Sequence, residues 1–489
     1  MTRIHGCLLC LALALLFALR SSAGVLEDAS RLETQGRFVQ AATLLQEGLQ
    51  QASLAPATHA QLRFELERLE RIKKDFPYSR EALFALLKKS VRDLTPQEFE
   101  QWLTEGRFDA REIDGRRLFM VSSVSNLFWR HPELNSRRLP AKDTESIQKE
   151  HWEVCRRIRE AAQTESMPYV LPKQFEVTMT VTVQANAAPT GQRMRAWLPV
   201  PREYPFQSGF ELMSSSPSLK SMADKFSPIR SVYLEQPARE GQPTVFSIVY
   251  RYTSQGVRFE VDPAKVTACD PNEASLQPFV SEAEHVVFTP EMRALSKRIA
   301  GTEFNPYLKA KKFHNWIAEN IKYSYAIEYS TIRNISDYCR SRGYGDCGQE
   351  ALLFITLCRL NGIPARWQSG WSTFPNSKSI HDWSEIYIAP YGWMPVDPYM
   401  GIYAMRYASA LTVQQRVEIR DFYFGGLDQY RMIANSDHSQ QLTPPKQSPR
   451  SDTVDFQRGE LEAGDQNLYF DQYSYNLTIK ELPLPAVKE

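Results

Sequence analysis

A cysteine at the start of an apolar stretch is the first residue in this sequence whose setting suits chemistry. Residues 343–366 read GYGDCGQEALLFITLCRLNGIPAR, and Asp346 and Gln349 fit a capping box that starts a helix at Cys347. Free backbone N–H groups and the positive end of the helix dipole favour a thiolate there. The adjacent Asp346 carboxylate opposes this effect, so Cys347 needs a basic partner to act as a nucleophile. Without one it is a structural cysteine beside a glycine-rich turn.

The residues after Cys347 predict a helix buried in the centre of a domain. They are apolar on almost every side, and Asn361-Gly362 followed by Ile363-Pro364 ends the helix with a left-handed cap. The glycines around the cysteine fit a turn that lets another part of the chain come close to the sulfur; they are Gly343, Gly345 and Gly348.

A basic partner for the thiol is present further along the chain. Residues 379–401 read SIHDWSEIYIAPYGWMPVDPYMG, whose alternation predicts a strand with His381 on one face, a turn, and a returning strand that ends at Asp397. A histidine and an acid placed in this way can form a general base and the group that orients it. A tight hairpin would put Asp397 opposite Ser384 or Glu385, so twist or a bulge is needed to bring it to His381. Glu385 is therefore an alternative orienting residue.

Several motifs in this order resemble the transglutaminase-like core. They are Gly345-x-Cys347, the buried helix, NGIPAR at 361–366, HDWSEIYI at 381–388 and GWMPVDP at 392–398. The resemblance covers about residues 285–430 and implies a papain-like α+β fold with a catalytic triad of Cys347, His381 and Asp397. Animal transglutaminases carry an aromatic residue after the nucleophile and calcium sites, whereas Gly348-Gln349 follows Cys347 here. The chain is more similar to the secreted bacterial branch of the family.

The resemblance implies acyl transfer through a thiol on a protein or peptide substrate. Water as the acceptor would make the protein a peptidase or amidase, and an amine would make it a transglutaminase. The backbone N–H of Cys347 is a natural donor to the oxyanion, and Trp316, Tyr323 and Tyr325 are candidates for a second donor. The alternative is a catalytically silent binding module that keeps the fold as a scaffold, although an intact triad argues against it. No HExxH motif or Cys/His cluster occurs, so we expect no metal and no cofactor.

Changes in the periodicity of the apolar residues along the sequence predict a multidomain α+β protein. Residues 1–23 read as a signal peptide, which predicts export to the periplasm or the extracellular space. Residues 24–170 predict a helical domain that packs or binds a protein partner, and residues 174–265 alternate as in a β-sandwich. The transglutaminase-like core at 285–430 comes next. Residues 431–489 predict a mobile polar loop and a last strand.

The net charge argues against a nucleic-acid-binding protein, and the number of cysteines bears on disulfide formation. The formal charge of +1 over 489 residues gives no basic surface for nucleic acid. Removal of the signal peptide leaves five cysteines, an odd number, so at least one thiol stays free within a single exported chain. Cys339 could pair with Cys155 or Cys269. Cys358 lies about three helical turns, some ~16 Å, beyond Cys347, too far for a disulfide.

Overall fold

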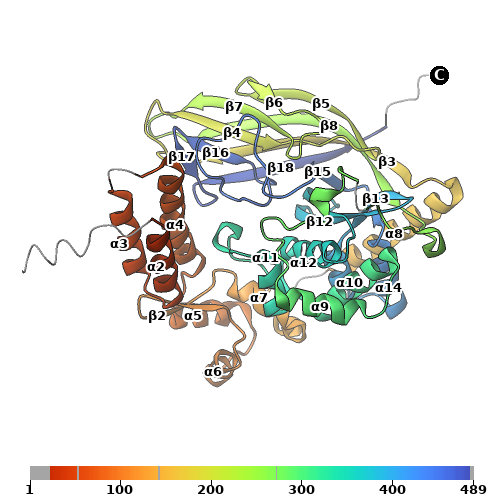
Figure 1. Cartoon of the computed structure of the whole chain (residues 1–489), viewed down its shortest axis with the longest axis horizontal. Coiled ribbons are helices and arrows are strands. Elements are labelled where there is room, and N and C mark those ends of the chain that lie inside the picture. Colours follow the sequence, from red (N-terminus) through yellow and green to blue (C-terminus); the bar gives the residue numbers. More distant parts are fainter. Residues whose placement is uncertain (1–21, 52–53, 141–143, 271–272, 485–489) are drawn as a thin grey trace, which may run out of the picture. The chain divides into compact units, whose positions relative to one another are not determined.

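The computed structural model describes residues 22–51, 54–140, 144–270 and 273–484 (Figure 1). The predicted signal peptide lies outside these ranges except for its last two residues, with which helix α2 (Ser22–Thr34) begins. The described chain forms two compact units. One comprises the residues up to Phe128 together with Glu133–Pro140, and the other comprises Trp129–Pro132 and the residues from 144 onward.

The first unit is mainly helical, as its periodicity predicts. Gly36, with φ +74°, connects α2 to α3 in a helix hairpin, where a Cβ would lie 2.9 Å from the carbonyl oxygen of Glu112. The Thr95 hydroxyl caps α6 by accepting from the N–H of Glu98. The sequence did not predict the hairpin of β1 and β2. The remaining elements are α3 (Phe38–Leu49), α4 (Pro56–Asp75), α5 (Arg80–Ser90), α6 (Pro96–Thr104), β1 (Ala110–Ile113), β2 (Arg116–Phe119), all but the last two residues of α7 (Ser123–Arg130), and all but the first residue of the 3-10 turn Pro132–Arg137.

Helix α8 (Glu145–Glu165) belongs to the second unit, although the sequence placed it in a helical domain ending at residue 170. Its buried face, which includes Val154 and Ile158, packs into the same hydrophobic core as the long strand that follows it. A Cβ on Gly256 of that strand's neighbour would lie 2.7 Å from the Ile158 side chain, so the helix lies directly on the sheet. The helical pattern of α8 was correct, and its tertiary partner was not visible in the sequence.

Two five-stranded sheets form one side of the second unit. The first has the order β14-β8-β3-β18 with β5 beside β8, and the second has the order β17-β16-β4-β7-β6. Buried side chains from both sheets meet in one core, among them Met179 and Ile248 of the first sheet and Ala196 and Val232 of the second. The strands are β3 (Tyr169–Val183), β4 (Arg193–Pro199), β5 (Gln207–Ser216), β6 (Ser221–Met222), β7 (Ser231–Pro237), β8 (Thr244–Arg258), β14 (Gly426–Leu427), β16 (Glu460–Ala463), β17 (Gln466–Leu468) and β18 (Tyr473–Leu482).

A four-stranded antiparallel sheet and the helices around it make up the rest of this unit. The sheet has the order β13-β12-β11-β15, and α12 packs against β11 and β12. A short parallel pair, β9 (Lys322–Tyr323) with β10 (Tyr344–Gly345), leads the chain into α12. The other elements are α9 (Pro290–Ala300), α10 (Pro306–Asn320), α11 (Ile335–Arg342), α12 (Cys347–Arg359), β11 (Ala365–Ser372), β12 (Ser379–Ile388), β13 (Gly392–Val396), α13 (Pro398–Tyr407), α14 (Val413–Phe422) and β15 (Arg431–Asn435).

The C-terminal region is an integral part of the second unit. Its strands, blue in Figure 1, pair with strands from much earlier in the chain: β15 with β11, β16 with β4, and β18 with β3 over ten residues. Residues 436–459, which we call the connecting segment, run from β15 to β16. The predicted mobile loop is wrong for the last part of this segment, because Ser451, Val454, Phe456 and Gln457 are at most 1% exposed. The single strand predicted in NLYFDQYSYNLTI is divided between β17 and β18.

None of the helices within the described ranges combines the length and apolar character needed to span a bilayer.

Candidate functional site

Cys347 occupies the first position of α12, as its sequence predicts. The Asp346 carboxylate caps the helix by accepting from the N–H of Gln349 at 3.1 Å. The helix is buried along its length and ends before Gly362, whose φ is +67°. A Cβ on Gly348 would lie 2.2 Å from the Tyr329 hydroxyl and 2.8 Å from the Trp367 ring, so this glycine permits the close approach that the turn requires.

The thiol of Cys347 has an acidic partner. Its Sγ donates to Oδ2 of Asp382 at 3.5 Å. Burial raises the pKa of Cys347 well above its ordinary value, and the negative charges of Asp382 and Asp346 raise it further. In this arrangement Cys347 is therefore a protonated thiol, although its side chain is only half-buried.

The Asp346 carboxyl is itself perturbed. Burial raises the pKa of Asp346 to about 6, against a hydrogen bond donated by the Tyr329 hydroxyl, which lowers it. The cap residue thus titrates close to neutral pH, beside the thiol.

His381 and Asp397 form a buried pair. Nε2 of His381 lies 2.7 Å from Oδ2 of Asp397, and the two side chains are 5% and 0% exposed. The other oxygen, Oδ1 of Asp397, accepts from the N–H of Met400 at 3.1 Å and so caps α13. This geometry orients the ring and leaves Nδ1 as the nitrogen that can exchange a proton with a reactant.

Arg431 of β15 continues this pair. Its Nη2 lies 3.1 Å from Oδ2 of Asp397, and its Nε donates to Oδ2 of Asp428 at 3.0 Å. Asp428 also accepts from the Tyr423 hydroxyl at 2.8 Å. The guanidinium therefore joins two buried carboxylates, and the result is a continuous chain from His381 to Tyr423.

This series of hydrogen bonds and ion pairs determines the protonation states of His381 and Asp397. Burial lowers the pKa of His381, the Asp397 charge opposes that shift, and the Arg431 charge adds to it, with a net lowering. Burial alone would raise the pKa of Asp397, but His381 and Arg431 bring it below its ordinary value. A neutral imidazole beside an ionised Asp397 follows, and this is the protonation state of a general base.

The sequence-predicted residues are thus only partly brought together. His381 meets Asp397, whereas Asp382 and not His381 bonds to Cys347. Successive side chains on a strand point to opposite faces, and Asp382 takes the face of β12 turned to α12. His381 shares the opposite face with Trp383, and the two rings are 5.6 Å apart.

The register of the hairpin differs from the expected one. Ser384 pairs with Val396 and Glu385 with Pro395, with no irregularity between β12 and β13. Asp397 therefore follows Val396 on the face that carries His381, and neither a bulge nor extra twist is needed. The alternative orienting residue Glu385 instead accepts from Arg366 and Gln368, each at 2.7 Å.

A cavity of about 80 Å³ adjoins His381. Tyr399 and Arg431 contribute to its walls together with three serines, Ser372, Ser377 and Ser379. The Tyr399 ring lies 5.2 Å from the His381 ring and 5.0 Å from the Tyr323 ring. The imidazole thus borders a small polar space.

Of the three candidates for a second oxyanion donor, Tyr323 is the one with an electrostatic link to the thiol. After burial, the charge of Cys347 is the next cause that raises the pKa of Tyr323. Tyr325 is 45% exposed and contacts the Tyr323 ring at 5.6 Å. Trp316 lies on α10, where its carbonyl oxygen accepts from Asn320.

Three residues at this site were missed from the sequence. Asp382 could have been found, because it follows His381 directly and alternation puts the two on opposite faces. Arg431 and Gln457, which bonds to Asp382, come from β15 and the connecting segment. No local pattern connects either to Cys347.

Across the described ranges, no group of three or more His, Cys, Asp or Glu side chains is placed to hold a metal ion. The five cysteines there are free thiols, so neither of the two pairings considered for Cys339 is formed. Cys347 and Cys269 are partly exposed, and the others are buried.

Comparison with known proteins identifies the core. Residues 293–398 match the model of the transglutaminase-like superfamily and include Cys347, His381 and Asp397. The chain therefore contains a transglutaminase-like core domain, as the motifs indicated.

The similar proteins found by comparison are distant. An uncharacterized protein of Haemophilus influenzae is 22% identical over 202 residues, which cover 36% of this chain and 51% of the relative. The chain thus spans about half the length of that relative. A structure described as a "Putative Cysteine Protease" from Cytophaga hutchinsonii is similar at 17% identity and a TM-score of 0.43, covering 66% of this chain and 94% of that one. The periplasmic domain of TgpA from Pseudomonas aeruginosa is similar at 13% identity and a TM-score of 0.25, covering 53% and 96%.

Proposed function

We propose that the protein is an exported thiol enzyme that transfers an acyl group from an amide or peptide bond through Cys347, His381 and Asp397. The observation that carries this proposal is the buried pair of His381 and Asp397 at 2.7 Å, whose His381 lies on β12, the strand packed against the helix that begins with Cys347. The match of residues 293–398 to the transglutaminase-like superfamily supports it. The two sheets that share a core support the predicted sandwich before a papain-like core.

The chemistry begins with proton transfer from Cys347 to His381. The thiolate attacks the amide carbonyl, and the backbone N–H of Cys347 donates to the oxyanion. As the C–N bond breaks, the imidazolium returns its proton to the leaving amine, and a thioester remains. Water or an amine then attacks the thioester, gives its proton to His381, and releases the thiolate. Asp397 keeps the imidazole in one tautomer throughout.

This sequence of steps requires Cys347 to exchange Asp382 for His381 as its partner. Because Nε2 of His381 is held by Asp397, the proton must go to Nδ1. Because Asp382 and His381 lie on opposite faces of β12, this exchange requires a rearrangement of the site when substrate binds. We infer that the thiol is protonated at rest and becomes reactive when substrate is bound.

The test measures both acceptors with one set of variants. Hydrolysis is followed as peptide release from fluorescein-labelled casein, and amine transfer as incorporation of dansylcadaverine into unlabelled casein. We expect Cys347→Ser and His381→Gln to lose about 10³-fold or more of the wild-type rate in whichever assay is positive, because nucleophile and base act as a unit. Cys269→Ser, which changes the other partly exposed cysteine, should keep the wild-type rate. Equal rates for wild type and Cys347→Ser would contradict the proposal.

A second candidate function is a catalytically silent binding module. The specific observation that favours it is the bond between Cys347 and Asp382, because an acidic partner stabilises the thiol and not the thiolate. In that case the folded wild-type protein gives no turnover in either assay, and a peptide ligand binds wild type and Cys347→Ser with equal affinity.

A further inference from the structure

The connecting segment reaches the site through one buried side chain. Nε2 of Gln457 donates to the carbonyl oxygen of His381 at 3.1 Å and to Oδ1 of Asp382. The Gln457 side chain is fully buried, and within the part of the chain that the structure describes its Oε1 is without a hydrogen-bond partner. One amide thus contacts both the backbone of the proposed base and the carboxyl that bonds to the proposed nucleophile.

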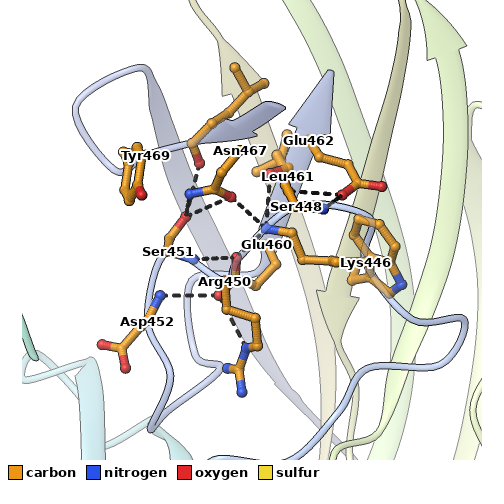
Figure 2. A network of polar contacts seen from close by, with 12 residues as sticks. Lys446, Ser448, Arg450, Ser451, Asp452, Glu460, Leu461, Glu462, Asn467 and Tyr469 are labelled. Atoms are coloured by element: carbon orange, nitrogen blue, oxygen red, sulfur yellow. Dashed lines mark hydrogen bonds and ion pairs between the residues drawn. The ribbon is translucent and has the colours of Figure 1, made fainter. Parts of the chain in front are cut away.

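A buried polar network anchors the connecting segment three residues from Gln457. Glu460, 1% exposed, accepts from Lys446 at 2.7 Å and from the N–H groups of Ser451 at 2.9 Å and Asp452 at 3.2 Å. Figure 2 shows these contacts converging on Glu460, with Arg450 on the same carboxylate at 3.3 Å. Gln457 therefore lies on a fixed stretch of chain, and its amide has little freedom to leave Asp382.

Asp382 accepts on both of its oxygens. Oδ2 accepts a hydrogen bond from the thiol of Cys347 at 3.5 Å, and Oδ1 accepts one from the side-chain amide of Gln457. Donors favour the carboxylate over the carboxylic acid. A carboxylate in contact with the sulfur opposes a second negative charge there, so the proton stays on Cys347.

The charged groups around this pair come from several elements. On the Cys347 side these are Asp346 and Glu350, from the cap and first turn of α12. On the Asp382 side, burial and the charges of Asp455, Asp346 and Asp452 raise the pKa of Asp382 well above its ordinary value, and the hydrogen bond from Cys347 opposes this shift. Arg458 of the connecting segment lowers the pKa of Asp346 and Asp455. Because acidic groups predominate, Asp382 needs a nearby donor to remain an acceptor for the thiol.

We propose that Gln457 is a positioning residue that holds the Asp382 carboxylate against the Cys347 thiol and thereby sets how readily this thiol reacts. The inference deepens the proposed function, since it assumes that Cys347 is the nucleophile. It also gives the connecting segment a role: the segment keeps the nucleophile at rest as a protonated thiol.

The test is alkylation of Cys347 by iodoacetamide in the full chain, followed by peptide mapping at a series of pH values. Loss of the Gln457 donor lets Asp382 retain a proton, so Cys347 can ionise beside a neutral group. We expect Gln457→Met to lower the midpoint pH of labelling by about one unit or more, since a unit charge some 4 Å away is a strong influence in a buried site. Asp382→Asn should give a shift of the same sign. The double variant should shift no further than Asp382→Asn, because Gln457 acts through Asp382.

Gln441→Met is the matched control, since it makes the same change at an exposed position of the connecting segment. Its labelling profile should equal that of wild type. If Gln457→Met does not fold, Gln457→Asn replaces it, because that variant keeps a buried amide and loses only one methylene of reach. A wild-type labelling profile in the folded Gln457 variant, or additive shifts in the double variant, would overturn the proposal. These readouts do not depend on turnover. If the protein is inactive in both casein assays but shows the shifts, the proposed function is contradicted and the role of Gln457 is still supported.

Discussion

At the scale of single residues, the site contains two proton-sharing pairs of opposite character. His381 with Asp397 is arranged to accept a proton, and Arg431 keeps Asp397 ionised at 3.1 Å. Cys347 with Asp382 is arranged to retain one. The two pairs lie on opposite faces of β12, whose alternation separates neighbours in sequence. Catalysis by this site therefore depends on moving one proton from the second pair to the first.

Arg431 should control the proton affinity of His381. Its charge lowers the pKa of His381, so Arg431→Met is expected to raise the midpoint of the His381 imidazole titration. The measurement is the NMR titration of the ring protons in histidine-labelled protein, assigned by their absence in His381→Gln. Below its pKa His381 is a cation and cannot act as a base, so the acid limb of any activity profile should move to higher pH with it.

Arg193→Met serves as the control, since Arg193 is 67% exposed and lies 3.7 Å from Glu235 on the second five-stranded sheet. The His381 midpoint should not change in this variant. An unchanged midpoint in Arg431→Met, with the His381 resonance still that of a folded protein, would contradict the prediction. The pKa of His381 would then depend on Asp397 and not on Arg431.

At the scale of elements, local signals predicted the parts of the core well. The apolar run from Ala351 to Leu360, the cap at Asp346 and the stop at Gly362 reproduce α12, because each depends on residues within one or two turns. The pair of His381 and Asp397 was also foreseen, since a single hairpin joins them. Arg431 and Gln457 could not be foreseen, because only the tertiary pairing of β15 and β16 brings them to the site.

Helix α12 carries an acid that its sequence pattern does not explain. Glu350 is 0% exposed, and neither of its carboxyl oxygens has a hydrogen-bond partner among the described residues. Burial raises the pKa of Glu350 well above its ordinary value, with Asp346 and Asp397 adding to the shift. The folded protein thus binds a proton more tightly than the unfolded chain, so the stability contributed by this proton is full at acid pH and is lost as the pH rises above 4.5.

Glu350→Gln should therefore stabilise the protein increasingly as the pH rises. We expect the free energy of unfolding to exceed that of wild type by ~1–3 kcal/mol at pH 8, because no buried group then has to ionise or hold its proton. Urea unfolding at pH 5 and pH 8 measures the difference. Glu291→Gln, at an exposed position of α9, should change stability by less than about 0.5 kcal/mol at either pH. A Glu350→Gln variant with no pH-dependent gain would show that the acid has a stabilising partner.

At the scale of the whole molecule, the second unit is closed by its own C-terminal region. β18 pairs with β3 from Tyr473–Val183 to Leu482–Gln174, and Leu477 stands opposite Met179, which is fully buried. These partners are almost 300 residues apart, which is why the composition of residues 431–489 predicted only a mobile polar loop and a last strand, without the strand partners. The same region supplies Arg431 to the proposed base and Gln457 to the proposed nucleophile. Both the fold of the second unit and its proposed site therefore depend on residues 431–489.

A chain that ends at Tyr430 should consequently fail to form a stable second unit. It loses β15, β16, β17 and β18, so β3, β4 and β11 each expose an edge and the apolar faces next to it. We expect insoluble protein, or complete digestion by a low concentration of trypsin under conditions where the full chain is resistant. A chain that ends at Leu482 keeps all of β18 and should resist like the full chain. If the shorter chain instead gives a soluble, resistant fragment with a cooperative melting transition, residues 431–489 are dispensable for folding, and the connecting segment would then act on the site as a separate part.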